Sequence, residues 1–148
     1  MNEELETRLH HEEMTLALNR KRAVAFFIDE ILLSFLLIIA LWDSFVAGST
    51  QEIIILTNSF VLEFMMMKII YQAFFVMQYG ATIGKLVMKI RVVEIKTLNN
   101  PNVLVALNRA IIRVISEMLL YLGFLWGLLN PSRQTWHDLS SKTLVVNA

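Results

Sequence analysis

The chain has 148 residues, of which 56% are hydrophobic and 18% are charged, with 13 Lys and Arg residues balanced by 13 Asp and Glu residues and no cysteine. The apolar share exceeds the roughly 45–50% of soluble domains, and the length allows one domain. A neutral chain lacks the basic face that nucleic-acid binding needs, and a chain without cysteine has no disulfide, thiolate metal site or cysteine nucleophile. Composition therefore predicts a membrane protein with no nucleic-acid partner.

Residues 1–19 form a polar lead before the first apolar stretch. Three leucines, Leu5, Leu9 and Leu16, lie in it at loose helical spacing, too few for a strong amphipathic anchor. We interpret this lead as a cytoplasmic N-terminal tail, a solvated or surface-lying helix, and assign residues 20–148 to the transmembrane domain.

Two apolar stretches have the length and composition of membrane-spanning helices. Residues 23–42 contain two acids as their only charges, and residues 53–77 contain one acid and one lysine. About 20 apolar residues cross a hydrocarbon core ~30 Å thick. We therefore predict one span in each stretch.

A third apolar stretch, residues 102–130, lies between two prolines and holds two arginines and a glutamate. As one helix it would be about 43 Å long at 1.5 Å per residue, more than a straight crossing requires. It therefore either tilts or bends near Gly123.

The distribution of Lys and Arg predicts the orientation. The flank before the first span contains Arg8, Arg20, Lys21 and Arg22, and residues 78–102 contain four Lys or Arg residues, whereas residues 43–52 contain none. Since basic flanks stay in the cytoplasm, the N-terminus and residues 78–102 are expected there. The C-terminal tail is also mildly basic, which conflicts with a single third crossing.

Two short segments, residues 86–95 and 143–146, are rich in β-branched side chains, as strands are. Their pairing requires both on one side of the membrane, which favours a re-entrant or twice-crossing third stretch over a single span. The predicted fold is all-α and integral to the membrane, with two to four transmembrane or re-entrant helices and a small cytoplasmic β pairing.

Seven ionisable residues lie inside the predicted membrane segments. An ionisable group in a bilayer costs at least ~2.5–3.5 kcal/mol on insertion scales, so it usually faces the protein interior, pairs or serves function. These residues are our candidate ion or proton pathway: Asp29, Glu30, Glu63, Lys68, Arg109, Arg113 and Glu117.

Depth along the helices predicts one ion pair. Asp29 lies about 9 Å from the cytoplasmic start of the first span, at 1.5 Å per residue, and Lys68 lies about 13 Å from the same side. Because a lysine side chain covers that offset, we expect Lys68 to pair with Asp29 or Glu30. The alternative is that Lys68 snorkels to the surface unpaired.

Charges of the third stretch recur at every fourth residue, as Arg109, Arg113 and Glu117, and so share one helical face. Arg113 and Glu117 can pair along that face. On the first span, Arg22 lies two turns below Asp29. We expect the two faces to oppose each other as a buried polar seam, or as an ion-pair zipper that fixes helix register and transports nothing.

Two pairs of glycines are spaced four residues apart, Gly80 with Gly84 and Gly123 with Gly127. Such pairs let two membrane helices approach closely, which would suit a homo-oligomer. The alternative is a flexible bend.

Several motifs occur in an order that resembles one family of membrane proteins. They are Arg22-Ala23 and Ile28-Asp29, Gly80-Ala81-Thr82-Ile83-Gly84-Lys85, Lys89-Ile90-Arg91-Val92-Val93, Arg133-Gln134-Thr135-Trp136-His137-Asp138 and Lys142-Thr143-Leu144-Val145-Val146. Together they cover about residues 20–146 and are similar to the RDD family. Its name refers to an arginine and two aspartates, which the resemblance places at Arg22, Asp29 and Asp138.

The turn motif Gly80, Thr82, Gly84 and Lys85 matches the family, while residues 140–142 are Ser-Ser-Lys where the family commonly has a small residue and a glycine. The turn is not a nucleotide-binding loop, which needs four residues between its glycines and Ser or Thr after its lysine. Lys85 is instead placed to meet lipid phosphates or a helix C-terminus.

We expect no enzyme, cofactor or metal. His137 and Asp138 lack further converging ligands, and the serines lack a His and Asp partner pattern. The resemblance implies a multi-pass protein of the bacterial cytoplasmic (inner) membrane, in a family with cation/proton antiport proposed for some members and scaffolding for others.

Two functions remain open. In the first, Asp29 titrates between a proton and a monovalent cation during transport, with Glu63 as the second candidate. In the second, the buried charges are structural and the chain is a scaffold or assembly partner. The expected partners are the lipid bilayer, a proton or monovalent cation, and a second copy or another membrane protein.

Overall fold

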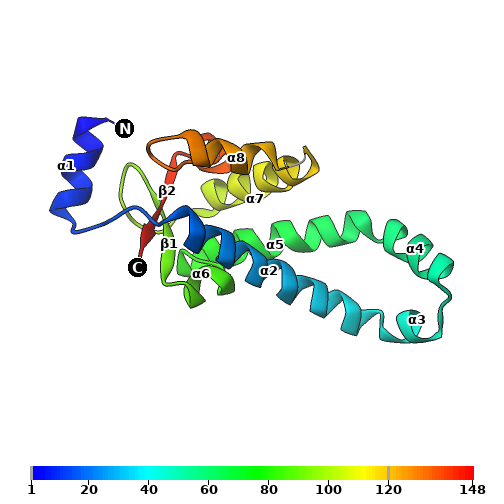
Figure 1. Ribbon diagram of the computed structural model, residues 1–148. Helices are drawn as coiled ribbons and strands as arrows, with labels where there is room; N and C mark the ends of the chain where they lie inside the picture. Colours follow the sequence, from blue (N-terminus) through cyan, green and yellow to red (C-terminus); the bar gives the residue numbers. More distant parts are fainter. Residues whose placement is uncertain (1, 120) are drawn as a thin grey trace.

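The computed structural model describes residues 2–119 and 121–148. Two long helices, α2 (Asn19–Ala40) and α5 (Val61–Tyr79), run away from a small sheet near which both termini lie (Figure 1). At 1.5 Å per residue they are about 33 Å and 28 Å long, which suits a hydrocarbon core of ~30 Å. Of the described helices, these two are long and apolar enough to cross a membrane by length and composition.

Each long helix has an apolar face that the rest of the chain leaves uncovered. The exposed side chains recur at every fourth residue, Phe27, Ile31, Phe35 and Ile39 on α2 and Leu62, Met66, Ile70 and Phe74 on α5. A spacing of four places residues on one side of a helix. These two faces are the surfaces that acyl chains would cover.

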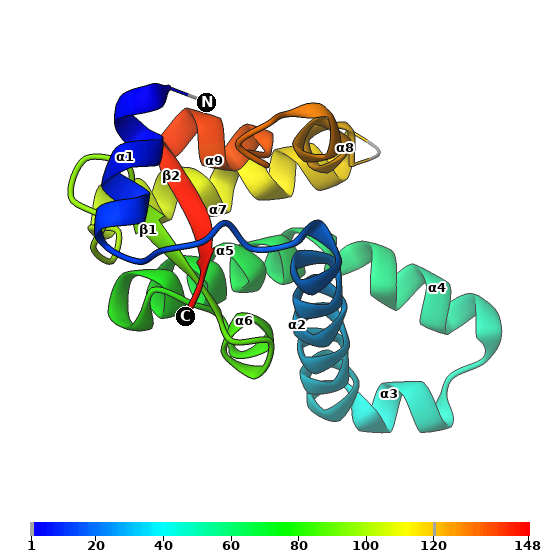
Figure 2. The same cartoon turned by 60° about the vertical axis from the view of Figure 1, so that its left-hand side comes forward.

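The second predicted span is divided at Phe60 into α4 (Thr50–Ser59) and α5, whereas the apolar pattern predicts one helix over residues 53–77. The Ser59 hydroxyl donates to the backbone carbonyl of Leu56 at 2.8 Å just before the break. Such hydroxyl bonds compete with the helical ladder, which explains the interruption. The short helix α3 (Trp42–Ala47) connects α2 to α4 at the far end (Figure 2).

The two predicted strand segments pair. β1 (Ile90–Glu94) and β2 (Thr143–Asn147) form an antiparallel ladder in which Val92 faces Val145. β1 begins later than predicted because residues 83–87 form a short helix, α6 (Ile83–Val87). The β pairing of the predicted fold is therefore confirmed.

The N-terminal tail packs on this sheet. The amide of Ala17 donates to the carbonyl of Val145 at 2.9 Å, which extends the sheet by a short bridge. Helix α1 (Glu3–His11) begins at the N-cap Asn2 and buries Leu9 against the sheet. The tail is thus a surface-lying helix docked on the base of the molecule.

The third apolar stretch folds back on itself. It forms α7 (Val103–Met118) and α8 (Leu122–Leu129), with a left-handed residue at Tyr121, and α9 (Trp136–Ser141) follows. Because β1 precedes α7 and pairs with β2 after α9, both ends of the stretch lie at the same end of the molecule. The chain therefore reverses direction within this stretch, and at about 12 Å α8 is too short to cross a bilayer.

The helices pack unevenly around this return. α5 packs chiefly along α7, α2 packs on α6, and α7 also contacts α9 (Figure 2). The arrangement brings side chains from α2, α5, α7 and α9 into the interior, where three groups of polar residues lie.

Candidate functional site

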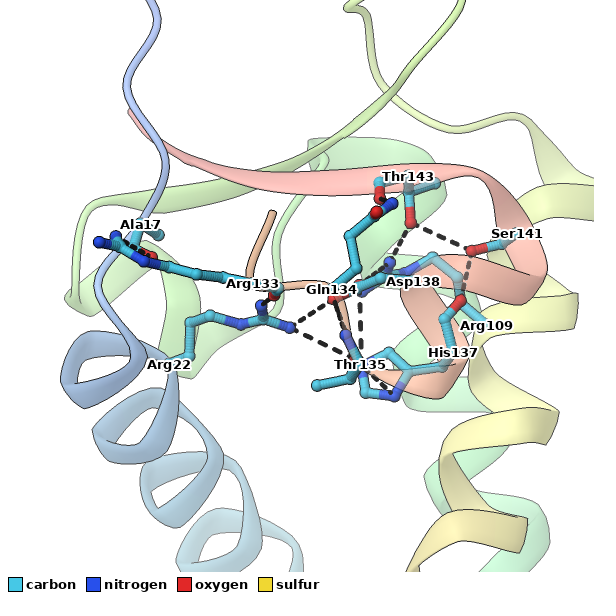
Figure 3. A network of polar contacts seen from close by, with 10 residues as sticks. All are labelled: Ala17, Arg22, Arg109, Arg133, Gln134, Thr135, His137, Asp138, Ser141 and Thr143. Atoms are coloured by element: carbon cyan, nitrogen blue, oxygen red, sulfur yellow. Dashed lines mark hydrogen bonds and ion pairs between the residues drawn. The ribbon is translucent and has the colours of Figure 1, made fainter. Parts of the chain in front are cut away.

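The first group joins two of the three family-signature residues. The Asp138 carboxylate is fully buried and accepts from Arg22 Nη2 at 2.5 Å through its Oδ2 atom. Its Oδ1 atom accepts from Arg109 Nη1 (Figure 3). We call Arg22, Arg109 and Asp138 the signature cluster. It ties α2 and α7 to α9.

Local structure fixes Asp138 in this place. Thr135 is the N-cap of α9, and both its amide and its hydroxyl donate to Asp138 Oδ2, at 3.0 and 2.9 Å. This is a capping box, in which the third helical residue bonds back to the cap. One carboxylate therefore starts α9 and receives both arginines.

The surroundings of the signature cluster are also hydrogen-bonded. Arg109 donates to the Thr143 hydroxyl, and Arg22 donates to the carbonyl of Arg133. Arg133 in turn donates to two carbonyls of the N-terminal tail, that of Ala17 at 3.1 Å (Figure 3) and that of Leu16 at 3.2 Å. The network therefore extends from the membrane helices to the tail.

Electrostatics fix the charge states in this region. Burial alone would raise the pKa of Asp138, but the charges of Arg22 and Arg109 outweigh it and hold that pKa well below its ordinary value. Burial lowers the pKa of neighbouring His137 well below its ordinary value, against the attraction of Asp138. At neutral pH the region therefore holds an ionised carboxylate and a neutral imidazole.

The second group surrounds Asp29, which is 1% exposed. Its Oδ1 atom accepts from the Tyr71 hydroxyl at 2.7 Å and from the Gly84 amide at 2.8 Å, and its Oδ2 atom accepts from the Thr82 hydroxyl at 2.6 Å. The pairing of Asp29 with Lys68, one of two predicted alternatives, does not occur. Asp29 instead fastens the turn motif to α2.

The glycines of the turn motif are required by geometry. A Cβ atom on Gly84 would lie 2.1 Å from the carbonyl oxygen of Ala25, so only glycine lets α6 approach α2 this closely. Gly80 ends α5 with a φ of 70°, a left-handed conformation that glycine adopts without steric cost.

The second glycine pair is also used within the chain. A Cβ atom on Gly123 would lie 2.3 Å from the Ser116 hydroxyl, and one on Gly127 would lie 2.9 Å from the Thr135 methyl carbon. The first contact lets α8 fold back onto α7, and the second lets it pack against the start of α9. The glycine spacings therefore serve intrachain packing and no longer argue for a second copy.

The third group lies between the membrane helices and consists of Glu30, Lys68, Arg113 and Glu117, which we call the membrane cluster. Lys68 Nζ lies 2.8 Å from Glu30 Oε2 and 2.6 Å from Glu117 Oε2. Arg113 Nε lies 3.4 Å from Glu117 Oε1, and Arg113 Nη2 lies 3.9 Å from Glu30 Oε1. The predicted Glu30–Lys68 and Arg113–Glu117 pairs are thus present, with two positive and two negative charges.

The membrane cluster has unmet hydrogen-bonding capacity. Among the described residues, buried polar atoms without a partner are Gln72 Nε2 and Arg113 Nε, in or beside this cluster, and Ser116 Oγ, which faces Gly123 of α8. Arg113 stacks on Phe26 instead, 5.1 Å from the ring centre. A buried polar group without a partner is costly, which marks this region as one that can rearrange.

The remaining candidates lie outside the membrane cluster. Arg109 belongs to the signature cluster and lies one helical turn from Arg113. The single buried polar seam that the sequence predicted is therefore divided into the signature cluster and the membrane cluster. Glu63 is exposed at the start of α5 and lines an open crevice between α2 and α5. The structure does not bring it near the other carboxylates.

Two cavities flank the membrane cluster. The basal cavity, about 250 Å³, lies between α2, α6, α8 and α9 and reaches Arg113. The distal cavity, about 410 Å³, lies between α2, α5 and α7 and reaches Lys68 and Glu117. Between them, the space enclosed by the four charged side chains is too small for a water molecule.

Sequence reasoning missed several partners of these charges. Tyr71, which donates to Asp29, is a polar residue in an apolar helix, and that was the available signal. Thr143, at the start of β2, was predicted only as part of a strand and of a family motif, not as a partner of Arg109. Within residues 2–119 and 121–148, no three His, Asp or Glu side chains converge as metal ligands would.

Comparison with known proteins identifies the family of this chain. The model of the RDD family matches residues 16–142, nearly the whole chain. No curated protein and no solved structure matches it. The match covers the membrane helices, the turn motif and the signature cluster. The chain belongs to the RDD family.

Proposed function

We propose that this RDD-family membrane protein exchanges a proton for a monovalent cation, and that the membrane cluster is where they compete. The observation that supports this proposal is two carboxylates, Glu30 and Glu117, that share Lys68 within the membrane helices. A proton or a cation that binds one of these carboxylates weakens the attraction between that carboxylate and Lys68. The ammonium group of Lys68 then shifts toward the other carboxylate.

Access to the cluster supports the same proposal. The distal cavity reaches Lys68 and Glu117, the basal cavity reaches Arg113, and the closed space between them separates the two. A transport site needs access from both sides but not at the same moment. Rearrangement of the ion pairs would open one side as the other closes.

Asp29 has a different role in this proposal from the one that its position in the sequence suggests. Its two oxygens already accept three hydrogen bonds, which fasten α6 to α2. Protonation of Asp29 would weaken all three bonds, because a charged carboxylate is the stronger acceptor. We therefore assign transport to Glu30 and Glu117 and a structural role to Asp29.

The test is cation-dependent dissipation of a pH gradient in proteoliposomes. We expect Na⁺ or K⁺ to collapse the gradient with the wild-type protein, and Glu117→Gln or Glu30→Gln to slow it by about tenfold or more, equivalent to 1.4 kcal/mol or more in barrier height. Glu63→Gln is the matched control, since it removes a carboxylate of α5 that lies outside the cluster. Equal rates for Glu117→Gln and the wild type would contradict the proposal.

The alternative function is a membrane scaffold. It is favoured by the balanced pairing of the cluster, which suits an ion-pair zipper that fixes helix register. A folded wild-type protein that dissipates no gradient, with a stoichiometric partner recovered by cross-linking, would establish this function in place of transport.

We also propose a multi-pass location in the bacterial cytoplasmic membrane, with both termini in the cytoplasm. The support is the run of Arg20, Lys21 and Arg22 at the start of α2 and the sheet that holds both ends of the chain together. Because the chain has no cysteine, Ala148→Cys creates a unique exposed thiol. A membrane-impermeant thiol reagent should label it only after the cells are opened; labelling of intact cells would reverse the orientation.

A further inference from the structure

The basal cavity has an excess of positive charge. Three cationic side chains line it, Arg22, Lys85 and Arg113, against one carboxylate, Asp29. Asp29 is already occupied by its three donors, and Arg22 is held by Asp138. Arg113 is shared with Glu117 and Glu30, which leaves the charge of Lys85 without a counter-charge. The neighbouring His137 adds no negative charge. The cavity therefore favours an anion.

Lys85 is the cation for which the fold supplies no partner. It is 9% exposed, and its ammonium group makes no hydrogen bond or ion pair with any residue that the structure describes. Burial of a lysine side chain without a partner is costly, even where its end opens to a cavity. The turn motif nevertheless holds Lys85 in place through Thr82 and Gly84, which are fixed to α2. A buried lysine held rigidly at a cavity wall is suited to binding a ligand.

The other walls of the cavity are apolar and lead to the lipid-facing surface. Phe27, Leu125 and Leu128 line the cavity and are more than half exposed. Arg22 lies three residues after the start of α2, about 5 Å along the helix axis, so the cationic part is at the depth of lipid headgroups. An acyl chain could leave the cavity along the exposed faces of α2 and α8.

We infer that the basal cavity binds the phosphate group of an anionic amphiphile, with Lys85 and Arg113 on the phosphate oxygens and α2 and α8 against the alkyl chain. Lysine binds phosphate as a point charge, and arginine adds directed donors. A headgroup phosphate of a membrane lipid and free inorganic phosphate share this chemistry. The apolar walls favour the lipid.

Burial, with the charges of Arg109 and Arg113, lowers the pKa of Lys85 well below its ordinary value. A bound phosphate opposes this and favours the charged ammonium form, so ligand binding and protonation of Lys85 support each other. The site does not depend on transport, because a phosphate can bind there whether or not an ion moves through the protein. A bound phosphate would, however, lie against Arg113 and so would influence the membrane cluster.

Native mass spectrometry of the purified full-length protein tests the inference, with phosphatidic acid, phosphatidylglycerol and phosphatidylcholine as added lipids. We expect one tightly bound anionic lipid per chain and weaker binding of zwitterionic phosphatidylcholine. Lys85→Gln should weaken anionic lipid binding by about tenfold, as expected for loss of one charge-assisted hydrogen bond. Lys89→Gln is the matched control, because Lys89 is an exposed lysine of the same segment that does not line the cavity.

A second variant covers the case in which Lys85→Gln does not fold. Ala23 is exposed on α2 and lines the cavity, so Ala23→Trp should fill the cavity and block binding without a change of charge. If inorganic phosphate competes with the lipid, or stabilises the wild type but not the variants, the anion site holds and its natural ligand is soluble. Equal lipid binding by the wild type and folded Lys85→Gln or Ala23→Trp, or no anion binding at all, would overturn the inference.

Discussion

The signature cluster and the membrane cluster both bury charges, but they differ in how completely their polar atoms are bonded. Asp138 accepts from Arg22, from Arg109 and from both donors of Thr135. In the membrane cluster, Arg113 Nε has no hydrogen-bond partner. A saturated network resists change, whereas an incompletely bonded one can reorganise at lower cost. We therefore assign stability to the first cluster and ion chemistry to the second.

The residues for which the family is named lie in the networks whose hydrogen-bonding capacity is best satisfied. Arg22 and Asp138 bind each other, and Asp29 binds the turn motif. The signature therefore marks the contacts that bring α6 and α9 to α2. The proposed transport site, the membrane cluster, lies one helical turn beyond the signature cluster along α7.

The largest expected effect is that of Asp138→Asn. It leaves two buried arginines without their shared carboxylate, and breaking a buried ion pair in this way costs about 3–5 kcal/mol. We expect the free energy of unfolding to fall by that amount, measured by thermal or chemical unfolding in detergent. Asp43→Asn, at an exposed position, should have no measurable effect. Equal stability of the two variants would remove the structural role of the signature cluster.

The pH dependence of stability should report His137. Its pKa in the folded protein is lowered below the ordinary 6.5, so below about pH 6.5 the unfolded chain binds a proton that the folded chain does not. Stability should therefore fall on acidification, by up to about 1.4 kcal/mol per pH unit. The lowered pKa of Asp138 adds stability that is lost only at pH values below its ordinary 3.8, so it does not affect this range.

His137→Gln sharpens this measurement. Unfolding between pH 5 and 7 should lose most of its pH dependence in the variant, while His10→Gln, at an exposed position, should keep it. An unchanged slope in His137→Gln would show that the imidazole is not buried in its neutral form.

The smallest expected effect is at Lys142, which ends α9 with a φ of 53°. This is where the family pattern has a glycine, and a side chain in the left-handed region costs about 1–2 kcal/mol. Lys142→Gly should raise stability by about 0.5–1 kcal/mol after the entropy cost of glycine. Lys142→Ala keeps the Cβ atom and should give no such gain; an equal gain in both would assign the effect to the lysine charge.

Sequence patterns predicted the parts of the fold that depend on local composition. Apolar length located α2 and α5, and β-branched residues located the strands whose pairing brings the third stretch back. Depth along the helices predicted that Lys68 pairs with Asp29 or Glu30, and the partner is Glu30. Each of these inferences needs only one element or two neighbouring elements.

The division of the polar seam was not predictable in the same way. Arg109, Arg113 and Glu117 share one face of α7, yet Arg109 meets Asp138 while Arg113 and Glu117 meet Glu30 and Lys68. Spacing gives the face of a helix but not which neighbour lies opposite each turn. That depends on α9, whose position is set by its capping box and by the return of the chain through α8.

The most direct test measures stability and cation-dependent proton flux in the same two variants, Asp29→Asn and Glu117→Gln, each against the wild type. The account predicts that Asp29→Asn loses about 1–3 kcal/mol of stability, as one of its hydrogen-bond donors is left without an acceptor, but retains flux per folded molecule. Glu117→Gln should remain folded and lose its flux. Asp29→Asn that folds as well as the wild type but transports nothing would contradict the account and return the transport carboxylate to Asp29.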